Sequence, residues 1–140
     1  MIYEVEQLCF TDGTAFSKSA IRSQMRPGSN FKWILCASSE YIAAYAVIHS
    51  RKNSSKARLY NIAVNPESRG KGHAKWLLSE VDRIASEMGK TEIHLEVRST
   101  NDSAIALYEK NGFTAVGVMN DYYDKGVHAL KMSKTISSRT

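Results

Sequence analysis

A strand, a glycine-rich turn and a helix follow one another in the middle of the chain. Leu59–Val64 is rich in apolar residues and predicts the strand, while the apolar positions from Ala74 to Met88 recur on one helical face. Gly70 and Gly72 lie in the turn, where they allow backbone angles that other residues resist. A helix directs its free N–H groups and the positive end of its dipole at the turn before it, so this stretch predicts a phosphate-binding site.

Basic residues in and beside the turn favour an anionic ligand without fixing its class. Arg69, Lys71 and Lys75 add positive charge. The P-loop pattern G-x-x-x-x-G-K-S/T is absent, and the dinucleotide pattern G-x-G-x-x-G fails at Lys75. An ordinary glycine-rich turn with a basic surface is the alternative that this stretch alone leaves open.

The rest of the chain predicts further strands and helices. We expect strands at Phe31–Ala37, Tyr41–Ile48, Thr91–Arg98, Ala115–Met119 and Val127–Ser133, and helices at Val5–Phe10, Ser17–Met25 and Ser103–Lys110. A turn at Ser38–Glu40 would make the first two strands a hairpin. The basic stretch His49–Arg58 is expected to be a loop, either solvated surface or a lip that contacts substrate. This order predicts an α/β fold with a mixed sheet and helices packed on it.

Length and composition fit a single globular domain over residues 1–140. Hydrophobic residues make up 43% and charged residues 24%, which excludes a disordered chain or a coiled coil. The net charge of +5 favours anionic partners such as nucleic acid, a phosphorylated cofactor or the ribosome. A mildly basic soluble protein without such a partner is the alternative.

The sequence lacks the features of membrane and secreted proteins. No apolar run approaches the roughly 20 residues that a membrane span needs, and residues 1–10 have neither the basic start nor the apolar run of a secretory signal. Cys9 and Cys36 lie far apart and outside any C-x-x-C pattern, which suits a reducing compartment. We therefore expect a cytoplasmic protein that does not bind a membrane.

Neither a metal site nor a cysteine nucleophile is expected. The four histidines do not form a metal-ligand spacing such as H-x-x-x-H; they are His49, His73, His94 and His128. A covalent acyl-cysteine scheme is conceivable, but Cys36 lies in an apolar strand, and buried, inert thiols are favoured.

The turn and several other segments form a combination of motifs in a fixed order. They are Leu59–Pro66, Arg69-Gly70-Lys71-Gly72-His73-Ala74, Leu95–Arg98, Asn101, Ala104–Phe113 and a turn at Asn120–Tyr123. The segment Arg69–Ala74 matches the R/Q-x-x-G-x-G/A motif of the GNAT superfamily of acyl-CoA-dependent N-acyltransferases. The whole combination resembles the RimI branch of this superfamily, which acetylates N-terminal α-amines of proteins. The resemblance spans about Arg58 to Met132. It implies a mostly antiparallel central sheet flanked by helices, with acetyl-CoA as co-substrate.

The resemblance implies that most of the expected site residues bind acetyl-CoA. The pyrophosphate of coenzyme A would be bound by Arg69, Gly70, Lys71, Gly72, His73 and Ala74. The backbone of Ile62, Ala63 and Val64 would pair with the pantetheine arm, and the N–H of the last would polarise the thioester carbonyl. Asn101 would contact the cofactor, and Tyr108 would donate a proton to its thiolate. Helix capping by Asn101 and core packing of Tyr108 are the alternatives.

Glu96 is the expected general base. Strand alternation puts it on the face opposite Leu95 and Val97, and it resembles the general-base Glu of the RimI branch. An α-amine has a pKa of about 7.7–8.0 against about 10.4 for lysine, so a modest base, acting directly or through water, could complete its deprotonation. A solvated strand Glu is the alternative. His94 lies two residues away on the same face and could tune the base.

The acceptor is the part that the sequence determines least. Tyr122 and Tyr123 would line the site for a peptide N-terminus, or serve as core or surface aromatics. The N-terminal third is short for the RimI branch, and Asp12–Ser17 differs from its aromatic- and proline-containing loop. A homodimer is left open.

Three functions therefore remain for the whole chain. One is acetylation of a protein N-terminus, such as that of a ribosomal protein. A second is acetylation of a small amine: a polyamine, an amino acid or an antibiotic. The third is non-enzymatic binding of RNA or the ribosome, for which no recognisable nucleic-acid-binding motif appears.

Overall fold

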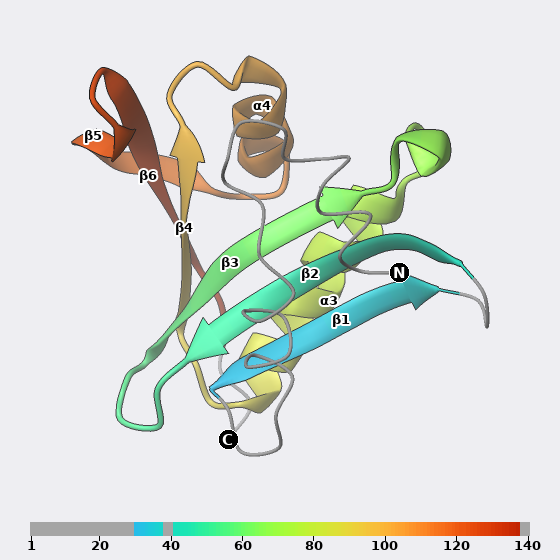
Figure 1. Ribbon diagram of the computed structural model, residues 1–140. Coiled ribbons are helices and arrows are strands. Elements are labelled where there is room, and N and C mark those ends of the chain that lie inside the picture. Colours follow the sequence, from blue (N-terminus) through green and yellow to red (C-terminus); the bar gives the residue numbers. More distant parts are fainter. Residues whose placement is uncertain (1–29, 38–40, 138–140) are drawn as a thin grey trace. The chain divides into compact units, whose positions relative to one another are not determined.

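The computed structural model of the chain describes residues 30–37 and 41–137 (Figure 1). The elements are β1 (Phe31–Ala37), β2 (Ile42–Ser50), β3 (Lys56–Val64), the short 3-10 helix η1 (Pro66–Ser68), α3 (His73–Glu87), β4 (Glu92–Arg98), α4 (Asp102–Lys110), β5 (Thr114–Asp124) and β6 (Val127–Thr135). The expected helices at Val5–Phe10 and Ser17–Met25, and the expected turn at Ser38–Glu40, lie outside the described residues.

The six described strands form a sheet in the order β1-β2-β3-β4-β6-β5. The pairs β1–β2, β4–β6 and β5–β6 are antiparallel, whereas β3 and β4 run parallel where Lys56–Arg58 pairs with Glu92–His94. Helices flank the sheet. The expectation of an α/β fold with a mixed, mostly antiparallel sheet is therefore confirmed.

Contacts within the chain group it into two compact units. The first unit comprises the described part of Met1–Arg51 together with Leu59–Val81, and the second comprises Lys52–Arg58 together with the described part of Asp82–Thr140. The single domain over residues 1–140 stays a prediction.

Strand β2 forms the centre of the first unit. Every residue from Ile42 to Ile48 is buried, as expected for a strand covered on both faces. The backbone N–H of Asn65 donates to the carbonyl of Ala43 at 2.7 Å, and the Asn65 side chain accepts the N–H of Glu67 at 3.2 Å. Asn65 thus fixes the end of β3 against β2 and caps η1, which sets the start of the glycine-rich turn.

The second unit shows the expected alternation along β4. Ile93, Leu95 and Val97 are buried, whereas the intervening charged or polar residues are half-buried. Met132 of β6, which is paired with Leu95 across the ladder and so lies on the same face, is also fully buried. One face of β4 is therefore core, and the other presents Glu92, His94, Glu96 and Arg98.

The predicted loop at His49–Arg58 is wrong at both ends. Strand β2 continues to Ser50, whose N–H donates to the carbonyl of Asn30 at 3.0 Å and extends the hairpin. Strand β3 already begins at Lys56, and Ala57 is buried between two charged residues. These charges can be tolerated in a strand because Lys56 and Arg58 pair with acidic residues of β4.

The predicted end of β5 at Met119 and the expected turn at Asn120–Tyr123 are also corrected. The strand runs to Asp124, with an irregular register between Met119 and Asp124. Asp121 adopts a positive φ of 55°, and its N–H donates to His128 Nδ1 at 2.9 Å. Because Asp accepts left-handed angles more readily than most residues, it can absorb a bulge that keeps the hairpin paired.

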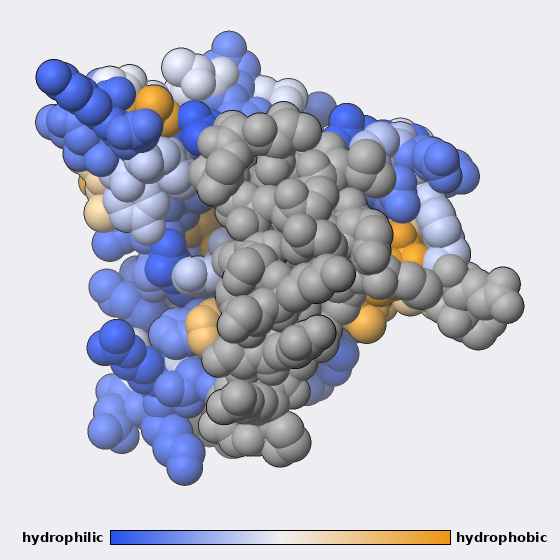
Figure 2. Space-filling model, in the orientation of Figure 1, coloured by the Kyte–Doolittle hydropathy of each residue, from blue (hydrophilic) through white to orange (hydrophobic). Residues whose placement is uncertain are grey.

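The visible surface of the described residues is mostly hydrophilic (Figure 2). Exposed large apolar side chains include Val116, Val118 and Met119 on β5. Among the described residues, no helix combines the length and the apolar character needed to cross a membrane.

Truncating a buried and an exposed side chain of the second unit should change the free energy of unfolding by different amounts. Leu95 is 1% exposed and Val118 is 60% exposed. We expect Leu95→Ala to lower the free energy of unfolding by about 2–5 kcal/mol, because it leaves a cavity in the core. Val118→Ala on the same unit should change it by about 0.5 kcal/mol at most. Urea unfolding measures both, and equal losses would contradict the described burial.

Candidate active site

The glycine-rich turn leads from η1 into α3 within the first unit. Gly70 and Gly72 have φ angles of 79° and 81°, in the left-handed region that favours glycine. A Cβ at either position would meet nothing within 4 Å, so the backbone angles rather than crowding require glycine there. The Gly72 carbonyl accepts the N–H of Trp76 at 3.1 Å, the first helical bond of α3.

Positive charge surrounds this turn. The first N–H groups of α3 have no partner inside the helix, and they carry the positive end of its dipole. Arg69, Lys71 and Lys75 are exposed beside them. The turn therefore has the backbone conformation and the charge that an anionic phosphate requires. His73 and Ala74, which complete the motif, are half-buried at the helix start.

The structure also brings a thiol to this turn, which the sequence analysis did not foresee. Cys36 Sγ lies 3.3 Å from Nδ1 of His73. Cys36 is half-buried, so the expectation of a buried thiol is corrected: its strand is an edge strand of the described sheet. Cys9 lies outside the described residues.

Residues Ile62, Ala63 and Val64 form the end of β3 in the same unit. Ala63 is buried in the core with Tyr45 and Val47, and its two neighbours are half-buried. This segment is followed by η1 and the turn, so the strand expected to pair with pantetheine and the turn expected to bind the pyrophosphate are consecutive in the chain.

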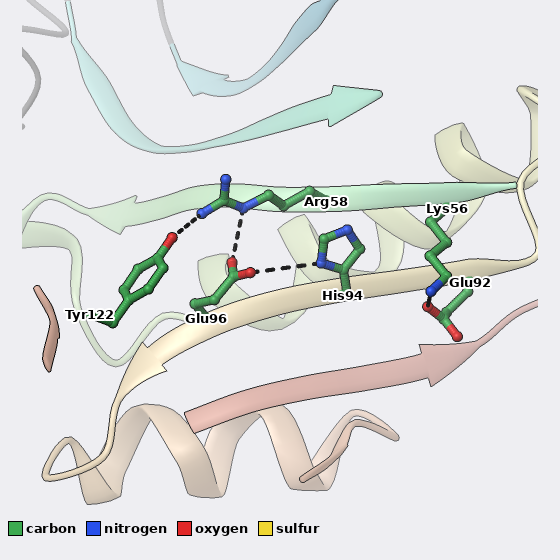
Figure 3. Close-up of polar contacts among 6 residues, drawn as sticks. All are labelled: Lys56, Arg58, Glu92, His94, Glu96 and Tyr122. Carbon is green, nitrogen blue, oxygen red and sulfur yellow. Dashed lines mark hydrogen bonds and ion pairs between the residues drawn. The ribbon is translucent and has the colours of Figure 1, made fainter. Parts of the chain in front are cut away.

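Glu96 lies in a polar cluster of the second unit (Figure 3). Arg58 Nε donates to Glu96 Oε2 at 2.9 Å, and Arg58 Nη2 donates to the Tyr122 hydroxyl at 2.8 Å. His94 Nδ1 lies 3.9 Å from the other carboxylate oxygen, Oε1. The Glu96 side chain is only 10% exposed. The candidate base is thus mostly shielded from water, on the polar face of β4.

Burial and charge act in opposite directions on the two basic groups of this cluster. Burial lowers the pKa of Arg58, but the nearby Glu96 and Tyr122 outweigh it, so the net shift is upward and the guanidinium stays charged. Burial lowers the pKa of His94, assisted by Lys131 and Arg58 and opposed by Glu96 and Glu92. The imidazole is therefore neutral at neutral pH. Its Nδ1 atom is buried without a hydrogen-bond partner among the described residues.

Tyr108 lies on α4 and is buried, with its ring edge-on to Phe113 at 5.8 Å. Burial, and secondarily Tyr123, raises the pKa of the Tyr108 phenol above its ordinary value. The group therefore remains protonated at neutral pH, as a proton or hydrogen-bond donor must be.

Tyr122 and Tyr123 form an aromatic pair at the bulge of β5. Their rings lie 4.9 Å apart at 90°, and the guanidinium carbon of Arg98 lies 5.0 Å from the Tyr123 ring centroid. Burial, followed by Tyr122 and Glu96, raises the pKa of Tyr123 to about 12, although Arg98 acts the other way. Tyr122 is exposed and Tyr123 half-buried, so the pair presents one accessible hydroxyl-bearing ring beside Glu96.

Asn101 caps α4. Its side-chain oxygen accepts the N–H of Ala104 at 3.2 Å and a hydrogen bond from Ser103 at 3.3 Å. The capping alternative is therefore observed, and contact with a cofactor stays a prediction.

The expected site residues fall into two groups. The turn and Ile62–Val64 belong to the first unit, whereas Glu96, Asn101, Tyr108 and the tyrosine pair belong to the second. Within the second unit, Arg58 joins Glu96 to Tyr122, a role that the sequence analysis missed by treating Arg58 as loop. The alternation of Lys56, Ala57 and Arg58 could have indicated it. No group of metal-ligating side chains occurs among residues 30–37 and 41–137.

Known proteins that resemble this chain in sequence or in structure include N-acetyltransferases. A Bacillus subtilis (strain 168) protein, provisionally named ribosomal protein bS18-alanine N-acetyltransferase, is 28% identical over 137 residues, covering 97% of this chain and 88% of its own. The crystal structure of the ribosomal-protein-S18-alanine N-acetyltransferase from Escherichia coli superposes with a TM-score of 0.83 and 28% identity, over 99% of this chain and 87% of that one.

A more distant structure shares the fold. It is an aminoglycoside 6'-N-acetyltransferase complexed with coenzyme A, with a TM-score of 0.79 and 15% identity over 99% of this chain and 91% of that chain. The sequence model of the Acetyltransferase (GNAT) family matches residues 1–113. The chain therefore belongs to the GNAT family of acetyltransferases, enzymes for which acetyl-CoA is the co-substrate.

Proposed function

We propose that this enzyme transfers the acetyl group of acetyl-CoA directly to the N-terminal α-amine of a protein, such as a ribosomal protein. The observation that carries the proposal is the likeness to the Escherichia coli enzyme over 99% of this chain, since that enzyme is named for an alanine of ribosomal protein S18 as its acceptor. The Bacillus subtilis relative carries the same acceptor in its name. We propose the cytoplasm as the place of the reaction.

In the proposed mechanism the glycine-rich turn and the end of β3 bind the cofactor. The turn Arg69–Ala74 binds its pyrophosphate with backbone N–H groups and basic side chains. The backbone of Ile62, Ala63 and Val64 pairs with the pantetheine arm, and the Val64 N–H polarises the thioester carbonyl. Asn101 contacts the cofactor in addition to capping α4.

Glu96 and Tyr108 supply the base and the acid. Glu96 accepts a proton from the acceptor ammonium, directly or through water. The amine nitrogen then attacks the thioester carbon, so that a C–N bond forms, the C–S bond breaks and the nitrogen gives up its remaining surplus proton to the departing sulfur or to solvent. Tyr108 supplies a hydrogen bond or a proton to the departing thiolate, while Tyr122 and Tyr123 line the site of the peptide N-terminus.

An α-amine suits this machinery better than a lysine side chain. Its pKa of about 7.7–8.0 leaves a substantial neutral fraction near neutral pH, whereas lysine at about 10.4 is almost wholly charged. One half-buried carboxylate is a modest base, so it can serve the first amine more easily than the second.

The acceptor class can be tested with two peptides. One has a free Ala-Arg N-terminus and no lysine, and the other has a blocked N-terminus and an internal lysine. We expect thiol release from acetyl-CoA with the first peptide only, because only its amine has a substantial neutral fraction near neutral pH. Release with neither peptide, in protein that binds acetyl-CoA, would contradict the proposal and point to a small amine as acceptor.

The acid–base pair predicts two slow variants. Glu96→Gln removes the proton acceptor and Tyr108→Phe removes only the phenol hydroxyl. Each should lower kcat by about 100- to 10,000-fold, with the affinity for coenzyme A largely kept. Steady-state kinetics and a direct cofactor titration measure the two quantities. Unchanged kcat in both variants would remove these residues from the mechanism.

The turn predicts a variant with weaker cofactor binding. Gly72→Val places a β-branched residue at a φ of 81°, where strain of about 1–3 kcal/mol would disturb the turn. We expect the KM for acetyl-CoA to rise by about tenfold. Gly89→Val is the matched control, because Gly89 has a φ of 78° and lies beyond the opposite end of α3. Equal KM values in the two folded variants would reject the turn as the cofactor site.

A further inference from the structure

We propose that Arg58 is a positioning residue, which fixes the Glu96 carboxylate and the Tyr122 hydroxyl in one arrangement and thereby aims the base at the acceptor. The inference rests on the proposed function, because it presupposes that Glu96 is the base and that Tyr122 faces the acceptor. Figure 3 shows the side chains that carry it.

One guanidinium makes both connections. Arg58 Nε donates to Glu96 Oε2 at 2.9 Å, and Nη2 donates to the Tyr122 hydroxyl at 2.8 Å. The planar guanidinium holds its donors at fixed angles, so the positions of its two partners are linked. A lysine ammonium would supply the charge without this fixed fork.

The bond to Arg58 distinguishes the two oxygens of Glu96. Oε2 is the acceptor of the Arg58 bond, whereas Oε1 is turned towards His94 Nδ1, at 3.9 Å. The oxygen outside the guanidinium bond is the one that can take a proton from an amine or from a water. Arg58 thus sets which carboxylate oxygen is presented, and in which direction.

The surrounding strands make this arrangement rigid. Arg58 is the residue of β3 that pairs with His94 of β4, two positions before Glu96, and all three belong to the second unit. The side chains of Arg58 and Glu96 are 29% and 10% exposed, so water competes little for their bond. Residues on paired strands hold a geometry better than residues on loops.

A second ion pair on the same strands is the internal comparison. Lys56 Nζ lies 3.5 Å from Glu92 Oε2, and the Lys56 side chain is 55% exposed. It has the same charges and joins the same two strands, but it is open to water, and among the six residues of Figure 3 Lys56 is joined to Glu92 alone. Lys56→Gln is therefore the matched control for Arg58→Gln.

The test is a double-mutant cycle with acetyl-CoA and the free Ala-Arg peptide. We expect Arg58→Gln to lower kcat by about 10- to 100-fold, since misplaced catalytic groups cost about this much. Arg58→Lys should also fall below the wild type, because it keeps the charge and loses the fork. The KM for acetyl-CoA should stay within about twofold of the wild type in both variants, and Lys56→Gln should leave kcat unchanged.

The variant with both Arg58→Gln and Glu96→Gln separates positioning from general support of the fold. If Arg58 acts through Glu96, the double variant should be no more than about twofold slower than Glu96→Gln alone. Losses that multiply would overturn the inference, as would an Arg58→Gln variant that matches Lys56→Gln. If Arg58→Gln does not fold, Arg58→Lys in the same cycle decides by the same criteria.

The proposed function fails separately. If Glu96→Gln itself turns over normally, the assignment of the base is wrong, and the positioning role falls with it. If Glu96→Gln is slow while Arg58→Gln is normal, the base stands and only the positioning role is rejected.

Discussion

The parallel pairing of β3 with β4 is the contact on which the candidate acid–base cluster depends. Only Lys56–Arg58 takes part in it, yet this short ladder sets Arg58 beside His94 and within reach of Glu96. Charged side chains on adjacent strands can then neutralise one another across the sheet, while Ala57 between them points into the core. If this ladder shifted by one residue, the arginine would turn to the buried face and the carboxylate would lose its partner.

The glycine-rich turn depends on a different constraint, the anchoring of its start. Asn65 is bonded to β2 through its backbone and caps η1 with its side chain, and Ser68 is bonded to the Tyr41 hydroxyl at 2.7 Å. The chain therefore enters the turn from a fixed point, and Gly70 and Gly72 supply the left-handed angles that lead it into α3. A fixed entry and permissive glycines together leave the turn already in the conformation that the proposed anion site needs, so it would not have to be ordered at the moment of binding.

Much of this architecture could be predicted from the sequence, because periodicity and glycine placement are local properties. The alternation of Thr91–Arg98, the helical face from Ala74 to Met88 and the strand Phe31–Ala37 were all readable in this way, and the structure agrees within one or two residues. Two features were missed. The start of β3 is polar and alternates over three residues only, and the acidic residues of β4 that pair with its charges lie far away in the sequence. The approach of Cys36 to His73 joins residues 37 positions apart, which no local pattern encodes.

The buried state of Tyr108 restricts how it could serve the departing thiolate. Burial raises the pKa of its phenol above 10, whereas a thiol has a pKa of about 8.5. Complete transfer of the phenol proton to the thiolate would therefore run uphill, by about 1.4 kcal/mol for each unit of difference. A hydrogen bond costs no such transfer, and it is strongest where water is excluded. In the proposed mechanism Tyr108 thus acts chiefly by stabilising negative charge on sulfur as the C–S bond breaks, and the proton that leaves with coenzyme A can come from solvent afterwards.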